Sequence, residues 1–146
     1  MWNTLHDWVN KARNDLNQPD KLMSYRYFDL VVRLRNTPDT GYLRELHNTL
    51  DRAVKEASKY GPRLQRLLGD YYFQKQQFEQ AAIEYNKVKI LFEKNDHIPV
   101  AKLGLANTYD KMGETDRAKK LYRELSKKSS HPQIQKEAKQ WLNNNG

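Results

Sequence analysis

The chain contains no cysteine. This absence excludes disulfides, thiol nucleophiles and cysteine-ligated zinc, and it leaves the redox compartment open. The chain also has no run of 18 apolar residues, so no segment is predicted to span a membrane. Its first residues, MWNTLHDWVN, have an acid at Asp7 and no apolar core of the signal-peptide type. We therefore expect a cytoplasmic protein, although a chain whose leader had been removed would look the same.

Motifs for catalysis are missing as well. The sequence has no HExxH, no glycine-rich phosphate loop and no serine nucleophile elbow, and its acids are scattered among basic residues. The four histidines are far apart, at His6, His47, His97 and His131. His97 and His131 each come just before a proline, which favours solvated turn residues over metal ligands. The sequence predicts no enzymatic activity, no bound metal and no cofactor.

Helical periodicity dominates what is present. The 146 residues fit one domain, and a mean hydropathy of -1.02 with a net charge of +8 is very polar and basic. The positive charge favours an acidic partner, though only weakly. Between proline and glycine breaks, segments of 11 to 20 residues repeat their apolar positions with period 3.6, without strand-like alternation. We predict an all-α protein of about eight helices.

Residues 1–61 are predicted to form an N-terminal segment of three helices, either a diverged repeat or a separate helical cap. The second of these has two apolar faces, which predicts packing on two sides: Leu22, Tyr25, Phe28 and Val32 on one, and Tyr27, Val31 and Leu34 on the other. The third has a single stripe (Leu43, Leu46, Leu50, Ala53, Ala57 and Tyr60), with Gly61 as its C-terminal cap. Aromatic and arginine residues at 25–35 also fit nucleic-acid stacking, but a core helix is favoured. Trp2 and Trp8 indicate a packed N-terminal helix rather than a membrane anchor.

The sequence from residue 62 onward repeats itself at a shift of 37 residues. Six small or apolar positions coincide: Leu68 with Leu105, Gly69 with Ala106, Tyr72 with Tyr109, Ala81 with Ala118, Tyr85 with Tyr122, and Val88 with Leu125. Small residues allow two antiparallel helices to approach closely, and tyrosines fill the space between layers. We therefore expect stacked helix hairpins, with Ala81 and Ala118 buried at helix crossings.

This unit resembles the tetratricopeptide repeat, whose pattern has a Leu-Gly, a tyrosine, an alanine and a second aromatic at these spacings. The turns QQFEQA (76–81) and MGETDRA (112–118) match too, with Gly113 where the family prefers glycine. The chain departs from the family in its period, 37 rather than about 34, and in having Gln65 and Lys102 at the usual tryptophan position. The resemblance implies a right-handed superhelix of antiparallel helix hairpins. It assigns residues 62–146 to two repeats and a capping helix, whose packed side has Ile134, Ala138, Trp141 and Leu142.

The same resemblance implies a protein–protein interaction module: an adaptor, scaffold or assembly factor that binds a peptide or helix of another protein in a concave groove. The family's groove positions fall in this sequence on Arg63, Arg66, Asp70, Phe73 and Gln74, and on Val100, Leu103, Asn107, Asp110 and Lys111. Asn107 stands where many relatives grip the peptide backbone. Leu103 replaces one lysine of the carboxylate clamp found in some relatives, so that clamp is not expected here.

A basic stripe offers an alternative. Lys120, Arg123 and Lys127 share one face of the helix predicted at 115–128. A solvated face is the simplest interpretation. The other is contact with an acidic protein, an anionic lipid or a nucleic acid, which the steep salt dependence of phosphate binding would reveal. The sequence predicts neither the identity of the partner nor the oligomeric state.

Overall fold

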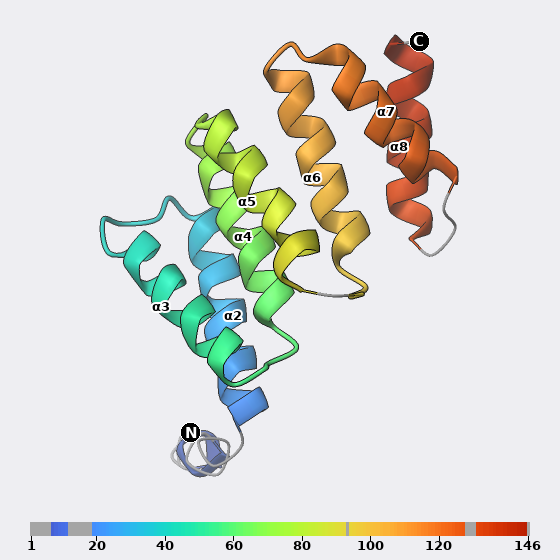
Figure 1. Ribbon diagram of the computed structural model, residues 1–146. Helices are drawn as coiled ribbons and strands as arrows, with labels where there is room; N and C mark the ends of the chain where they lie inside the picture. Colours follow the sequence, from blue (N-terminus) through green and yellow to red (C-terminus); the bar gives the residue numbers. More distant parts are fainter. Residues whose placement is uncertain (1–6, 12–18, 93, 128–130, 146) are drawn as a thin grey trace. The chain divides into compact units, whose positions relative to one another are not determined.

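The computed structural model describes residues 7–11, 19–92, 94–127 and 131–145, and these residues form helices and connecting turns without any strand. Residues 7–11 are helical. Seven bounded helices follow (Figure 1): α2 (Pro19–Arg35), α3 (Tyr42–Lys55), α4 (Gly61–Gln74), α5 (Phe78–Leu91), α6 (Ile98–Lys111), α7 (Thr115–Lys127) and α8 (Pro132–Asn145). The all-α prediction is confirmed. Over the described ranges, none of these helices has both the length and the apolar character needed to cross a bilayer.

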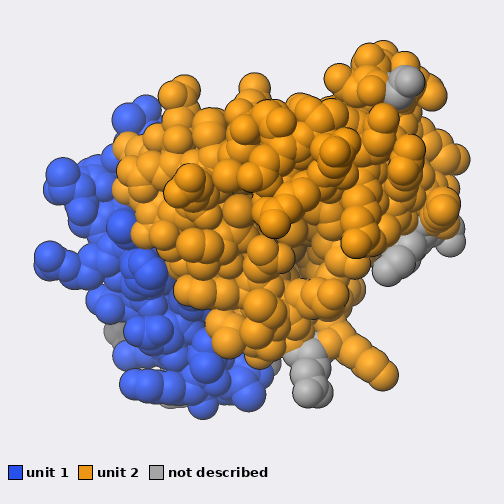
Figure 2. All heavy atoms as spheres, turned by 45° about the horizontal axis from the view of Figure 1, so that its top comes forward, with its two compact units in different colours: residues 1–64 blue, residues 65–146 orange. Residues whose placement is uncertain are grey.

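The chain divides into two compact units, residues 1–64 and 65–146 (Figure 2). The division falls inside α4, whereas the boundary predicted from the sequence followed residue 61.

In the first unit, α2 and α3 pack against each other through one face of each helix. The buried positions follow a single helical stripe on each: Met23, Tyr27, Leu30 and Leu34 on α2, and Tyr42, Leu46, Leu50 and Ala53 on α3. The Tyr42 hydroxyl donates a hydrogen bond of 2.6 Å to the Leu30 carbonyl, which fixes the two helices in register.

The prediction that α2 is packed on two sides is wrong for one of them. Tyr25, Phe28 and Val32 are 47%, 53% and 54% exposed, because the buried stripe runs along the other side of the helix. The N-terminal packing prediction also fails at Trp8, which is 66% exposed, while Trp2 lies outside the described residues.

The predicted cap at Gly61 is wrong as well. Helix α3 ends earlier, where Ala57 adopts a left-handed φ of 51° and the Ser58 amide donates to the Ala53 carbonyl. This pairing is the Schellman arrangement, which satisfies a terminal carbonyl without glycine. Gly61 instead begins α4.

The helices of the second part of the chain repeat with the shift seen in the sequence. Moving α4 by 37 residues gives the bounds of α6, and moving α5 gives the start of α7. Ala81 and Ala118 are completely buried, as predicted. Helix α6 packs against α5, α7 and α8, and α7 also packs against α8 (Figure 1).

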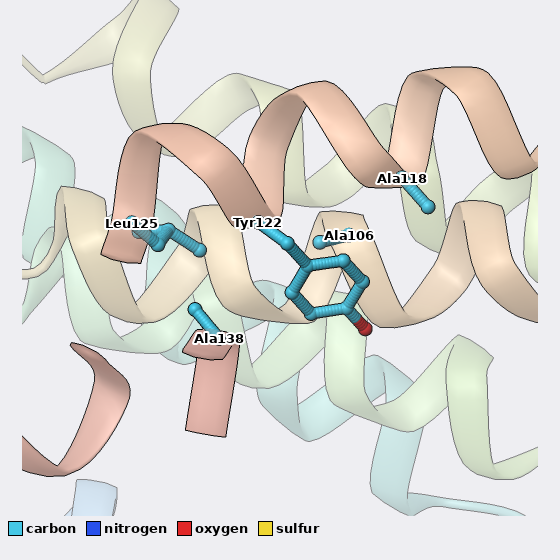
Figure 3. Packing of buried hydrophobic residues seen from close by; sticks show 5 residues of the cluster. All are labelled: Ala106, Ala118, Tyr122, Leu125 and Ala138. Atoms are coloured by element: carbon cyan, nitrogen blue, oxygen red, sulfur yellow. The ribbon is translucent and has the colours of Figure 1, made fainter. Parts of the chain in front are cut away.

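The C-terminal helix covers the last hairpin through an apolar cluster. Figure 3 shows the residues of this cluster, which are Ala106 of α6, Ala118, Tyr122 and Leu125 of α7, and Ala138 of α8. Ile134, Trp141 and Leu142 pack against this cluster, and the Trp141 ring stacks on that of Tyr122 with centroids 4.2 Å apart. The predicted packed side of the capping helix is confirmed.

Candidate binding groove over helix α6

On α4, most of the predicted groove residues make contacts within the chain. The Arg66 guanidinium pairs with Asp70 at 2.5 Å and its Nε donates to His97 at 3.0 Å. Arg63 lies over the Tyr60 ring, 5.4 Å from its centroid. Phe73 packs against the cluster that contains Ala81, Ala82, Tyr85 and Leu105. Gln74, the last residue of α4, is exposed.

A tyrosine hydroxyl engages the same groove position in both repeats. Tyr85 donates to the Asp70 carboxylate, and Tyr122, 37 residues later, donates to the Asn107 side-chain oxygen. Burial raises the pKa of Asp70 above its ordinary value, against the opposing effects of Arg66 and Tyr85. The pKa of Tyr85 is also raised, first by burial and then by the nearby Asp70 charge. Asp70 and Asn107 therefore position α5 and α7 on their partner helices.

On α6, the predicted groove residues are divided between packing and solvent. Leu103 packs against the α6–α7–α8 cluster and Val100 is half-buried, while Asp110 and Lys111 are exposed. Asn107 is exposed, and its side-chain oxygen accepts from Tyr122, so Leu103 is the anchor on this face that is engaged in packing.

The opposite face of α6 forms the floor of a groove of about 360 Å³, whose walls are α5 and α7. This volume lies within the range of about 300–1,000 Å³ usual for ligand pockets. The floor is mainly apolar: Ile98, Ala101, Leu105 and Tyr109 come from α6, and Tyr85 of α5 and Leu121 of α7 complete it. Residues 98, 101, 105 and 109 follow helical spacing, so they share a face that Val100, Leu103 and Asn107 do not.

The rim of this groove is basic. It carries four cations, Lys89, Lys102, Arg117 and Lys120, and one carboxylate, Glu124. Of the basic stripe predicted from the sequence, only Lys120 lines the groove, whereas Arg123 and Lys127 are exposed elsewhere on α7.

This groove was not predicted, because the basic residues of α7 indicate a single exposed stripe on that helix. The residues that line the groove from α7 are Arg117, Lys120, Leu121 and Glu124, which also follow an i, i+3, i+4, i+7 pattern. That mixed stripe was visible in the sequence. The sequence could not reveal that Lys89 of α5 lines the same groove. Residues of α5 and α7 line one groove because both helices pack against α6.

No group of three or more potential metal ligands occurs in the described part of the chain. Searches of protein-family models, of curated proteins and of solved structures each give no match to this chain.

Proposed function

We propose that this protein is a protein–protein interaction module and that a segment of its partner binds in the groove over α6. The observation that carries the proposal is the mainly apolar floor of that groove between two helical walls with exposed cations. Such a surface combines an apolar centre with a polar rim, as protein interfaces do. The proposed module has no chemistry of its own.

The tetratricopeptide-like superhelix is part of this proposal. Its support is the shared 37-residue shift of helix bounds and of the Tyr85 and Tyr122 hydrogen bonds. The proposed binding surface, however, differs from the one that the resemblance implies, because Leu103 on that other face of α6 packs within the chain and the Asn107 side-chain oxygen accepts from Tyr122. The cytoplasmic location expected from the sequence stays a prediction.

Nucleic-acid binding is the competing function, and the aromatic side chains of the groove argue against it. Binding of single strands uses aromatic faces on which bases stack. The Tyr85 ring is buried, and the Tyr109 ring has the Arg117 guanidinium over it at 5.3 Å. The Tyr85 ring is therefore closed to a stacking base, and on the Tyr109 ring a base would have to compete with Arg117.

Site-directed photo-crosslinking in cells tests the proposal. A photoreactive amino acid replaces Asn86 on the groove wall, Lys111 on the opposite face of α6, or Lys136 on α8. We expect a discrete protein adduct at position 86 only, and its loss when the floor is made polar by Leu121→Gln in a chain whose circular dichroism is unchanged. An adduct at position 111 without one at 86 would instead support the face predicted from the sequence. A nuclease-sensitive adduct at 86 would support nucleic-acid binding.

A further inference from the structure

The charges around the groove indicate the chemistry of its occupant, an inference that rests on the function proposed above. Two of the four cations are already paired. Lys102 lies 3.5 Å from Glu124, the only carboxylate on the groove, and Arg117 lies 3.2 Å from Glu114. Glu124 is the one acid among the lining residues, and it is paired with Lys102. The groove therefore has no acid of its own to neutralise the remaining cations.

Lys89 and Lys120 are those remaining cations. Both are exposed, and neither makes an ion pair with any of the described residues. Lys89 belongs to the α5 wall and Lys120 to the α7 wall, so the apolar floor on α6 lies between them. A ligand that fills the groove therefore meets positive charge on both sides and apolar surface in the middle.

We infer that the groove binds an acidic segment of a partner protein, in which a bulky apolar side chain is flanked by carboxylates. The apolar side chain packs on Ile98, Leu105 and Leu121 of the floor. The flanking carboxylates pair with Lys89 on one wall and Lys120 on the other, where the charges are complementary.

A polyanion without apolar groups fits this surface less well. A phosphodiester backbone would satisfy the two lysines but would leave the apolar floor exposed to water, whereas burial of apolar surface is the dominant favourable contribution in most protein–protein association. An acidic protein segment satisfies both parts of the groove at once.

Fluorescence anisotropy with defined probes tests the inference. The first probe is a labelled peptide in which two leucines are flanked on each side by glutamates. The second has glutamines in place of the glutamates, and the third is a labelled oligothymidylate of similar charge. Each is titrated with the wild-type chain, with Lys89→Gln/Lys120→Gln, and with Lys136→Gln/Lys139→Gln. The last variant removes the same charge from α8, which does not line the groove.

We expect the wild-type chain to bind the acidic peptide more tightly than either other probe. Because exposed ion pairs contribute modestly, removing both groove lysines should weaken binding by about tenfold, and the α8 variant by less than about twofold. Equal binding of the glutamine peptide, or no peptide binding at all, overturns the inference that the partner is acidic. In that case the crosslink at position 86 still decides whether the groove binds a protein. Equal losses in the two lysine variants show an effect of net charge alone and also overturn the inference. Tighter binding of the oligothymidylate, lost with the groove lysines, overturns both proposals.

Discussion

The Tyr85 ring of α5 lies so close to Gly104 of α6 that a β-carbon at position 104 would be 2.6 Å from two of its carbons. A β-carbon at Gly69 of α4 would meet the same ring at 2.6 Å. Tyr85 is therefore held between two glycines, and its hydroxyl is fixed on Asp70. The ring cannot move away from one helix without approaching the other. This contact sets how closely α5, one wall of the groove, can approach α6, which forms its floor.

Gly104→Ala should consequently destabilise the protein. Alanine is about 1 kcal/mol better than glycine inside a helix, but overpacking a rigid contact typically costs about 1–3 kcal/mol and should exceed that gain here. Urea denaturation followed by circular dichroism measures the net change. Gly41→Ala is the control, since a β-carbon there would meet its nearest neighbour at 3.6 Å and should be tolerated. A stabilised Gly104→Ala chain would show that the ring has room to move.

The turns after α4 and α6 allow a reciprocal test of backbone strain. Gln76 and Gly113 are equivalent positions and both have left-handed φ, 60° and 77°. In each turn the following amide donates to the carbonyl five residues earlier, at 2.9 Å, from Gln77 to Tyr72 and from Glu114 to Tyr109. A left-handed conformation costs an ordinary residue about 1–2 kcal/mol, but costs glycine little.

Gln76→Gly should therefore stabilise the protein by roughly 0.5–1 kcal/mol, and Gly113→Gln should destabilise it by about 1–2 kcal/mol. The free energy of unfolding of each variant, from urea titration, checks both signs. Since β-carbons at 113 meet nothing within 4 Å, crowding does not confound the second variant. Two changes of the same sign would contradict the equivalence of these turns.

How far the sequence predicts this molecule depends on whether an interaction repeats. The 37-residue shift predicted the burial of Ala81 and Ala118, because small residues recur at fixed spacing, and the apolar face of the last helix predicted the packed side of α8. It gave no hint of Gly104, since the matching position in the first repeat is Leu67, which is too large for such a contact.

Polar pairs between helices were equally hidden. In the sequence, Gln65 stands out only because the tetratricopeptide pattern has a tryptophan at that position, yet its amide donates to the buried Glu84 carboxylate at 2.7 Å. A buried carboxylate requires hydrogen-bond donors, and Gln80 also donates to it at 2.9 Å. Residues 65 and 84 are brought together only by helix packing. Sequence spacing alone could not distinguish them from solvated side chains, and the same holds for Lys89 and Lys120 of the groove.

Stability should fall in alkali because of two tyrosines. The pKa values of Tyr85 and Tyr122 are raised in the folded chain, chiefly by burial. Below about pH 10, the ordinary tyrosine pKa, both residues are protonated in the folded and unfolded chains and stability is unaffected. Above it, the unfolded chain loses these protons first, so unfolding becomes progressively more favourable. Each tyrosine can contribute at most about 1.4 kcal/mol per pH unit.

The slope of unfolding free energy against pH, measured by urea titration between pH 9 and 11, checks this expectation. Tyr85→Phe/Tyr122→Phe should lower the stability at pH 8 through its lost hydrogen bonds, and should also show a shallower alkaline slope than the wild type. All other ionisable groups are the same in the two chains, so the difference between their slopes comes from the two tyrosines. Identical slopes would mean that these hydroxyls ionise as easily in the folded chain as in the unfolded one.

Helix α8 should stabilise the second unit mainly through Trp141. Its ring stacks on Tyr122 at 4.2 Å, with 18° between the ring planes, and it packs on the buried cluster that Ala138 completes. Trp141→Ala removes a large apolar contact. We expect it to lower the free energy of unfolding by about 2–4 kcal/mol, which overlaps the lower end of the range for buried tryptophans.

Removing residues 132–146 should expose the cluster and promote self-association. Urea titration and sedimentation velocity measure the two effects, with the exposed Gln140→Ala as the matched control on the same helix. A Trp141→Ala chain as stable as the control, together with a monomeric truncated chain, would show that α8 contributes nothing to the packing of α6 and α7.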